Sequence, residues 1–187
     1  MRGRGRLAGA AASSGVLLVG GASTRFGSPK ALVQLGGETL ADRAWRVLGE
    51  ACAERIAVGK TADALVLPFP LIDDGTEVRA ALAGIVAGLR AARHEVAVVL
   101  PVDMPLVTPA LLHRLADACV DAAVTQTGPL PGAYRRTALP ALERALAEGQ
   151  LRVRDAIAEL EVVVVDADAA ELANVNSPED LTRIASG

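Results

Sequence analysis

Aromatic residues are scarce in this sequence: they make up 2% of its 187 residues, and one of them is a tryptophan. Apolar residues nevertheless amount to 51%, so the core is expected to consist mainly of Ala, Val and Leu. A chain of this length is in the usual range for one domain. No apolar run is long enough to span a membrane. We therefore expect one globular domain with an aliphatic core and no membrane segment.

Cysteine is also scarce, and neither positive nor negative residues are in clear excess. Lys and Arg number 19 against 22 Asp and Glu, and this near-balance excludes a broad nucleic-acid surface, which needs a clustered basic excess. Cys52 and Cys119 have no CxxC or histidine-rich spacing around them, so we expect reduced thiols of a cytoplasmic protein rather than a zinc site. His94 and His113 are expected at the surface.

The first 14 residues are basic and then rich in small residues. They are interpreted as a disordered leader or a misassigned start. They do not read as a signal peptide, because Gly20, Gly21 and Ser23 interrupt the apolar run that follows. The expected domain therefore covers residues 15–187.

Apolar runs alternate with helical patterns along most of the chain. Strands are predicted at 16–19, 56–58, 64–72, 96–100, 122–125 and 161–165, and helices at 39–53, 78–93, from 108, 137–147, 153–160 and from 177. This alternation predicts a three-layer α/β/α Rossmann-like fold with a mostly parallel sheet covered on both faces. Such sheets bind ligands at the carboxyl ends of their strands.

The first predicted strand runs into a glycine-rich loop, Gly20-Gly21-Ala22-Ser23-Thr24-Arg25-Phe26-Gly27-Ser28-Pro29-Lys30. Glycines let the backbone turn sharply and let its N–H groups approach a phosphate. Arg25 adds a planar fork of donors, and Lys30 adds a mobile positive charge. The loop therefore predicts a site for a nucleoside triphosphate and its leaving pyrophosphate.

Two common glycine motifs do not fit this loop. A P-loop has Lys directly after its last glycine, whereas Ser28 follows Gly27 here. The glycines are also too widely spaced for the dinucleotide fingerprint G-x-G-x-x-G. The spacing Gly-Gly-x-Ser-x-Arg-x-Gly-x-x-Lys instead resembles the signature of the MobA-like nucleotidyltransferases, and the similarity can be followed from about Val16 to Leu181.

This resemblance implies a nucleotidyltransferase fold and an enzyme that transfers GMP from MgGTP to the terminal phosphate of molybdopterin. Its implied partners are GTP, the molybdopterin cofactor and proteins of molybdoenzyme maturation. The catalytic residues would be Arg25, Lys30 and Asp103. The positions that the resemblance assigns to nucleotide binding are Leu18, Val19, Gly20, Gly21, Lys30, Gly59, Asp74, Gly84 and Asp103.

Asp103 is the predicted magnesium ligand. It follows the apolar run 96–100, at the edge of the sheet where ligands bind. Magnesium sites usually combine one or two carboxylates with substrate oxygens. The resembling family has an Asp-x-Pro element here that carries the metal, so we expect Mg²⁺ on Asp103.

Several positions leave the choice of base open. Asp73 and Asp74 both close the third predicted strand; the family pattern favours Asp74, and Asp73 remains an alternative. Gly59 occupies a nucleotide-contacting position without a side chain. Val19 stands where the family generally has alanine, and Ala80–Ala81 replaces a Gly-Pro pair.

The acceptor side is predicted near the C-terminus. Asn174 and Asn176 precede the closing helix, and the resemblance assigns them, with Arg152, to the pterin substrate. The segment 125–133 looks shortened relative to the family.

Three alternatives remain at this stage. A cytidylyltransferase on the same pterin and a sugar-phosphate nucleotidyltransferase share the fold, although the ending Asn-Val-Asn-Ser-Pro-Glu-Asp resembles the guanylyl branch more. A non-catalytic relative that delivers the cofactor is the third. The presence of both Lys30 and Asp103 argues against it, because a protein that only binds has less need of them. No Ser-His or Cys-His pair indicates a covalent nucleophile.

Overall fold

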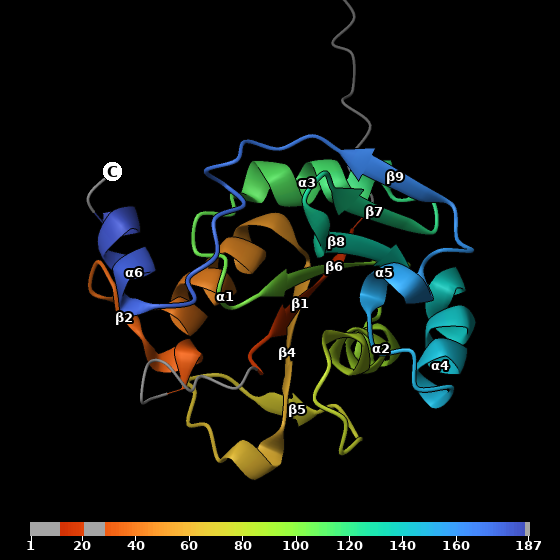
Figure 1. Cartoon of the computed structure of the whole chain (residues 1–187), viewed down its shortest axis with the longest axis horizontal. Coiled ribbons are helices and arrows are strands. Elements are labelled where there is room, and N and C mark those ends of the chain that lie inside the picture. Colours follow the sequence, from red (N-terminus) through yellow and green to blue (C-terminus); the bar gives the residue numbers. More distant parts are fainter. Residues whose placement is uncertain (1–11, 21–28, 186–187) are drawn as a thin grey trace, which may run out of the picture.

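Seven strands form one sheet, in the order β5-β4-β1-β6-β8-β7-β9 (Figure 1). The computed structural model describes residues 12–20 and 29–185. All neighbouring strands are parallel except at β8, which is antiparallel to both β6 and β7. The bounds of the strands are β1 Ser14–Leu18, β4 Glu54–Gly59, β5 Leu71–Asp73, β6 Val96–Pro101, β7 Ala122–Thr125, β8 Gly128–Arg135 and β9 Val162–Val165.

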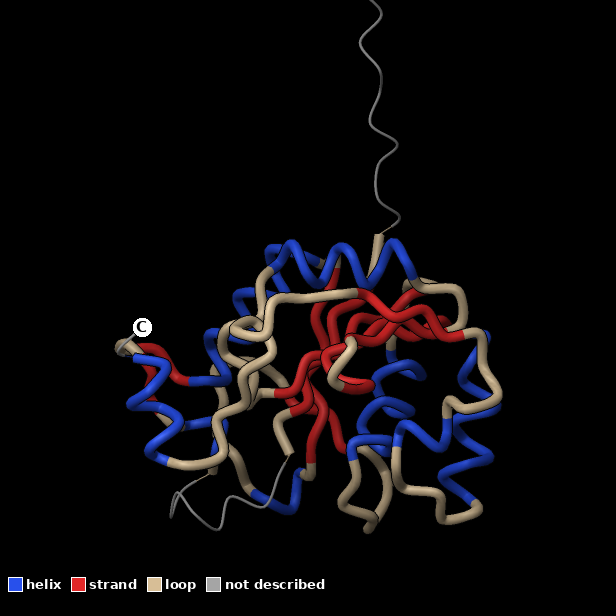
Figure 2. Tube along the Cα trace, turned by 45° about the horizontal axis from the view of Figure 1, so that its top comes forward, coloured by secondary structure: helices blue, strands red, loops and turns tan. Residues whose placement is uncertain are grey.

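Helices cover both faces of the sheet, which confirms the predicted three layers (Figure 2). Residues of α1 and α3 pack on one face, with α6 beside them, and residues of α2, α4 and α5 pack on the other. The bounds of the helices are α1 Leu40–Ala51, α2 Ala81–Ala91, α3 Pro109–Ala118, α4 Leu139–Ala147, α5 Val153–Ala156 and α6 Pro178–Ala185. In the described part of the chain, no helix is long and apolar enough to cross a membrane.

Local sequence signals explain where two of these helices begin. Thr39 Oγ1 accepts a hydrogen bond from the Asp42 amide at 3.0 Å, and Thr108 Oγ1 accepts one from the Leu111 amide at 3.2 Å. Each threonine satisfies an amide that the first turn of a helix leaves without a partner. The helix starts predicted at 39 and 108 are thus confirmed.

Several predicted boundaries were wrong. The first strand begins at Ser14 rather than at residue 16, and Ser14 pairs with Glu54 and Ala97; residues 1–11 lie outside the described part. The strand predicted at 64–72 is only β5, because Pro68 and Pro70 cannot donate to a strand ladder. The helix predicted at 153–160 is the single turn α5.

A hairpin and one strand of the main sheet were not predicted. A hairpin joins β2, Gln34–Leu35, to β3, Glu38–Thr39, through Gly36 and Gly37. Both glycines have positive φ, 63° and 82°, which a two-residue hairpin turn of this kind requires. The strand is β8, which begins within the segment 125–133 that looks shortened relative to the family.

Candidate functional site

A cavity of about 460 Å³ lies at the carboxyl ends of the parallel strands. Its wall includes the residues that follow four of them: Gly20 after β1, Lys60 after β4, Asp74 after β5 and Asp103 at the end of β6. The start of α2 closes another side. The predicted site residues that line this cavity are Leu18, Gly20, Lys30, Gly59, Asp74, Gly84, Asp103 and Asn174.

Backbone hydrogen bonds continue the sheet beyond the ends of the strands and hold these residues in place. The Val19 amide donates to the Val58 carbonyl at 3.0 Å, and the Val102 amide donates to the Leu18 carbonyl at 3.0 Å. The chain segments after β1, β4 and β6 therefore leave the sheet side by side. Val19 is buried beside the cavity rather than in its lining. Gly21 and Arg25 lie outside the described residues.

Lys30 lies between two oxygen acceptors from distant parts of the chain. Its Nζ donates to Asp103 Oδ2 at 3.0 Å and to Asn176 Oδ1 at 2.8 Å. The exposed fractions of the Lys30 and Asp103 side chains are 17% and 27%, so both remain accessible from the cavity. The structure thus brings the predicted phosphate ligand, the predicted metal ligand and one predicted acceptor residue into direct contact.

The start of α6 holds Asn176 in this position. Asp180 Oδ2 accepts hydrogen bonds from the amides of Asn176 and Ser177, at 2.9 and 3.0 Å. These hydrogen bonds, led by the one from Asn176, lower the pKa of Asp180. The Val175 amide also donates to the Asp103 carbonyl at 2.8 Å. The C-terminal segment is therefore bound directly to the end of β6.

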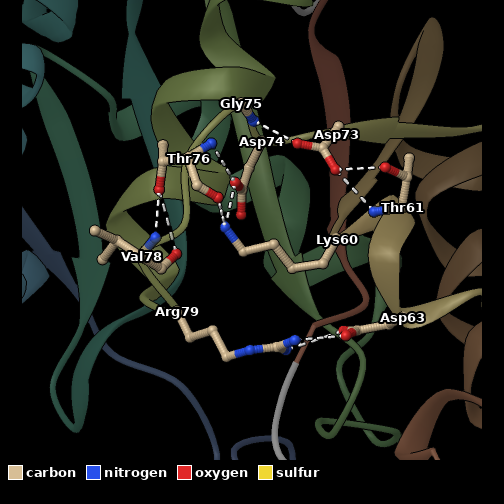
Figure 3. A network of polar contacts seen from close by, with 9 residues as sticks. All are labelled: Lys60, Thr61, Asp63, Asp73, Asp74, Gly75, Thr76, Val78 and Arg79. Carbon is tan, nitrogen blue, oxygen red and sulfur yellow. Dashed lines mark hydrogen bonds and ion pairs between the residues drawn. The ribbon is translucent and has the colours of Figure 1, made fainter.

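A buried ion pair lies on the β4 and β5 side of the cavity (Figure 3). Lys60 Nζ donates to Asp74 Oδ1 at 2.6 Å and also to the carbonyl of Thr76. The side chains of Lys60 and Asp74 are only 10% and 8% exposed. Asp74, which the family pattern favours as the nucleotide contact, thus lines the cavity.

Asp73, the alternative, has a different environment. It is exposed, and its carboxylate accepts hydrogen bonds from the Thr61 amide and hydroxyl and from the Gly75 amide. These hydrogen bonds, with the Thr61 amide first, lower the pKa of Asp73 to about 2. Asp73 therefore shapes the loops around the cavity and does not line it.

Gly59 and Val19 fit one another at the cavity edge. A Cβ atom on residue 59 would lie 2.8 Å from Val19 Cγ2, which is too close for carbon atoms that are not bonded. Val19 thus fills the space beside a residue that has no side chain. Polar contacts from the end of β4 must then come from the backbone or from Lys60.

A second cavity, of about 820 Å³, adjoins the first. The two share Ala81, Met104, Leu130 and Asn174 in their walls. Arg152 and Arg154, both exposed, line the second cavity near the start of β8. Two of the predicted acceptor residues, Arg152 and Asn174, therefore lie together, while Asn176 lies at Lys30.

Asp103 fits one kind of metal site. No group of three or more His, Cys, Asp or Glu side chains is placed to hold a metal ion within residues 12–20 and 29–185. Mg²⁺ in nucleotide sites commonly takes one or two carboxylates and completes its shell with phosphate oxygens and water. Asp103 thus fits an ion that arrives with a triphosphate.

Lys60 and Arg79 were missed by the sequence reasoning, although both line the first cavity. Arg79 makes two hydrogen bonds to the Asp63 carboxylate, at 3.0 and 2.6 Å (Figure 3). Lys60 follows Gly59 directly at the end of a predicted strand, and this position could have identified it. Arg79 lies in a loop whose path the sequence does not specify.

Comparison with known proteins agrees with this geometry. A family model described as the MobA-like NTP transferase domain matches residues 15–164. The chain is 35% identical to a probable molybdenum cofactor guanylyltransferase of Chloroflexus aggregans, over 90% of this chain and 91% of that protein. It is 32% identical to the molybdenum cofactor guanylyltransferase of Desulfosudis oleivorans, over 92% and 94%. It also resembles the crystal structure of molybdopterin-guanine dinucleotide biosynthesis protein A from Archaeoglobus fulgidus, with a TM-score of 0.79 and 27% identity, covering 92% of this chain and 97% of that one.

Proposed function

Since the chain belongs to the MobA-like NTP transferase family, we propose that it transfers GMP from MgGTP to the terminal phosphate of a molybdopterin cofactor and releases pyrophosphate. The observation that carries this proposal is the pair of adjoining cavities at one edge of the sheet. One holds Lys30 and Asp103, and the other holds Arg152 and Arg154. The two relatives named as guanylyltransferases support guanine as the base.

The transfer needs two anionic substrates held side by side. In the proposal, an oxygen of the pterin phosphate attacks the α-phosphorus of GTP; a new P–O bond forms, and the bond to the departing pyrophosphate breaks. Lys30 donates to phosphate oxygens and stabilises the charge that builds up on them. Arg152 and Arg154 supply positive charge for the acceptor phosphate. Alignment of the two substrates supplies much of the rate enhancement, so no covalent enzyme intermediate is needed.

Asp103 is the residue that would hold Mg²⁺ together with the triphosphate. The ion, when bound, neutralises phosphate charge and polarises the phosphorus centre. Lys30 already contacts this carboxylate at 3.0 Å, so a change at Asp103 also alters the position of the lysine.

Replacing Asp103 tests the proposal. Asp103→Ala is expected to abolish Mg²⁺-dependent GMP transfer while leaving the circular dichroism spectrum and the thermal unfolding midpoint close to those of the wild type. The matched control is Asp117→Ala, since Asp117 is an exposed aspartate on α3. Normal Mg²⁺-dependent activity of Asp103→Ala would overturn the assignment of the metal ligand.

Calorimetric titration of the wild type with GTP, CTP and ATP, each with Mg²⁺, tests the base. Selective binding of GTP is expected. Selective binding of CTP would favour the cytidylyltransferase alternative, and no Mg²⁺-dependent binding of any of the three would favour a non-catalytic relative.

A further inference from the structure

The buried Lys60–Asp74 pair is an unusual feature of the wall of a cavity. Both side chains are about nine-tenths buried, and removing two charges from water is costly. A pair of apolar residues of similar volume often stabilises a fold as well or better. The position of this pair, in the cavity and after neighbouring strands, therefore indicates a role toward a ligand.

Within residues 12–20 and 29–185, part of the hydrogen-bonding capacity of the pair is not used. An ammonium group has three hydrogens, and Lys60 Nζ uses two of them, on Asp74 Oδ1 and the Thr76 carbonyl. Asp74 Oδ1 also accepts from the Thr76 amide at 3.1 Å. Within the described residues, no hydrogen bond reaches Asp74 Oδ2. One donor and one acceptor thus remain side by side (Figure 3).

The position of this pair matches the base end of a bound nucleotide. The order β5-β4-β1-β6 places Lys60 and Asp74 on one side of β1, and Asp103 on the other. A nucleotide whose phosphates lie at Lys30 and Asp103 would direct its base toward the pair. The wall of the cavity also includes Arg79 and several small residues, among them Gly59, Ala80 and Gly84, and the small residues leave room for a flat ring.

We infer that Lys60 determines base specificity in this cavity: it donates to O6 of guanine, and Asp74 accepts from the 2-amino group. This inference rests on the proposed function and deepens it. Guanine presents an O6 acceptor, whereas cytosine and adenine present an amino group at the equivalent place. In cytosine or adenine the amino group would place a donor against the donor of Lys60. The pair therefore selects guanine by a hydrogen bond to O6 and rejects the other bases because two donors would face each other.

The test uses two analogues that each change one group of guanine. In 6-thio-GTP a sulfur, which is a poorer acceptor, replaces O6, and ITP lacks the 2-amino group. Wild-type enzyme is expected to have a kcat/KM for GTP at least tenfold above that for 6-thio-GTP. In Lys60→Met this ratio should fall to about one, chiefly through KM, while kcat changes less. In Asp74→Asn the ratio of kcat/KM for GTP to kcat/KM for ITP should fall instead.

Two controls separate base recognition from a structural role. Thr76→Ala removes the Oγ1 that accepts from the Val78 amide and so loosens the same loop. It should change KM for all three triphosphates equally and leave their ratios unchanged. The double variant Lys60→Met/Asp74→Leu avoids an unpaired buried charge, and both ratios should fall in it. Circular dichroism and thermal unfolding check the fold of each variant.

The outcomes are distinguishable from failure of the proposed function. Wild-type enzyme that prefers CTP or ATP to GTP contradicts the proposed function. Wild-type enzyme that prefers GTP, with the same ratio of GTP to 6-thio-GTP in wild type, Lys60→Met and the double variant, contradicts only the role of Lys60.

Discussion

Lys30 connects three distant parts of the chain at the site. It lies near the N-terminus, and its two acceptors come from the end of β6 and from the segment before α6. The same ammonium group is the proposed phosphate ligand. Two of its three hydrogens are used on these contacts, so the third can donate to a phosphate oxygen when the nucleotide binds.

Replacing Lys30 should affect turnover more than stability. Lys30→Ala is expected to lower kcat for GMP transfer by about 10²–10³-fold, the usual effect of removing one donor that stabilises a transition state. Lys30→Arg keeps the positive charge and should lose less. Steady-state kinetics with saturating MgGTP measures both. A kcat for Lys30→Ala within a few-fold of the wild type would contradict the role of Lys30.

The sequence predicted most of these residues but not their contacts. Lys30 and Asp103 were identifiable because each directly follows a strand or a glycine-rich loop. The contact between Lys30 and Asn176 joins residues 146 positions apart, and no local pattern specifies it. The position of Lys60 after a strand could have marked it as a candidate, but its burial against Asp74 depends on the tertiary structure and no local pattern specifies it.

Close packing of α2 on β1 is the main constraint at the scale of elements. A Cβ atom on Gly88 would lie 2.5 and 2.9 Å from the two γ-carbons of Val16. A Cβ atom on Gly84 would lie 2.7 Å from Leu18 Cδ2. Glycine at these two positions lets the helix approach the central strand and so sets the depth of the cavity.

Gly88→Ala should therefore destabilise the protein. Overpacking against a stiff β-branched side chain costs about 1–3 kcal/mol, which exceeds the ~1 kcal/mol that alanine gains over glycine inside a helix. The matched control is Gly49→Ala on α1, where the new Cβ atom would meet the movable end of the Arg55 side chain. Urea unfolding should show lower stability for Gly88→Ala and unchanged or slightly higher stability for Gly49→Ala. The reverse order would contradict this explanation.

Elements with a strong local signal were predicted, and those governed by tertiary contacts were not. The capped helices α1 and α3 were placed to within a few residues. The strand β8 was missed because Pro129, Pro131 and Gly132 are typical of loops. These prolines occupy its irregular start, and its regular pairing with β6 covers residues 132–135. Gly132 is needed there, because a Cβ atom would lie 2.4 Å from the Pro129 carbonyl oxygen.

At the scale of the whole molecule, Glu54 links β4, β1 and the segment before β6 at the amino-terminal ends of these strands, opposite to the cavity. Its carboxylate accepts hydrogen bonds from Ser14 Oγ in β1 and from the backbone and side chain of Arg93, shortly before β6. Burial alone would raise the pKa of Glu54, but these hydrogen bonds outweigh it and lower the pKa to about 2.

Glu54 should make the free energy of unfolding depend on pH below about 4.5. Because its pKa is lowered from 4.5 in the folded protein, its contribution is complete above about pH 4.5 and is lost as the pH falls toward 2. Glu54→Gln is expected to lower the free energy of unfolding by about 1–2 kcal/mol at pH 7. The difference from wild type should shrink between pH 4.5 and 2. Urea unfolding at pH 7, 4 and 3 measures it, and a constant difference would contradict this assignment.

The layered architecture was more predictable than the order of the strands in the sheet. Alternating apolar runs and helices were enough to predict a mostly parallel sheet with helices on both faces. They do not specify that the first strand, β1, lies in the interior of the sheet between β4 and β6, or that the chain later reverses direction at β8. That order depends on which apolar surfaces pack best over the entire molecule.

Because β1 lies between β4 and β6, its pairing is completed late during synthesis on the ribosome. Ser14 pairs with Glu54 on one side and with Ala97 on the other, so its second neighbour is made more than eighty residues later. At about 5–20 residues per second, the apolar segment Val16–Val19 waits on the order of 4–16 s for that neighbour. During this interval one side of β1 lacks its partner strand, and the nascent chain cannot complete the cavity until β6 and Asp103 have emerged.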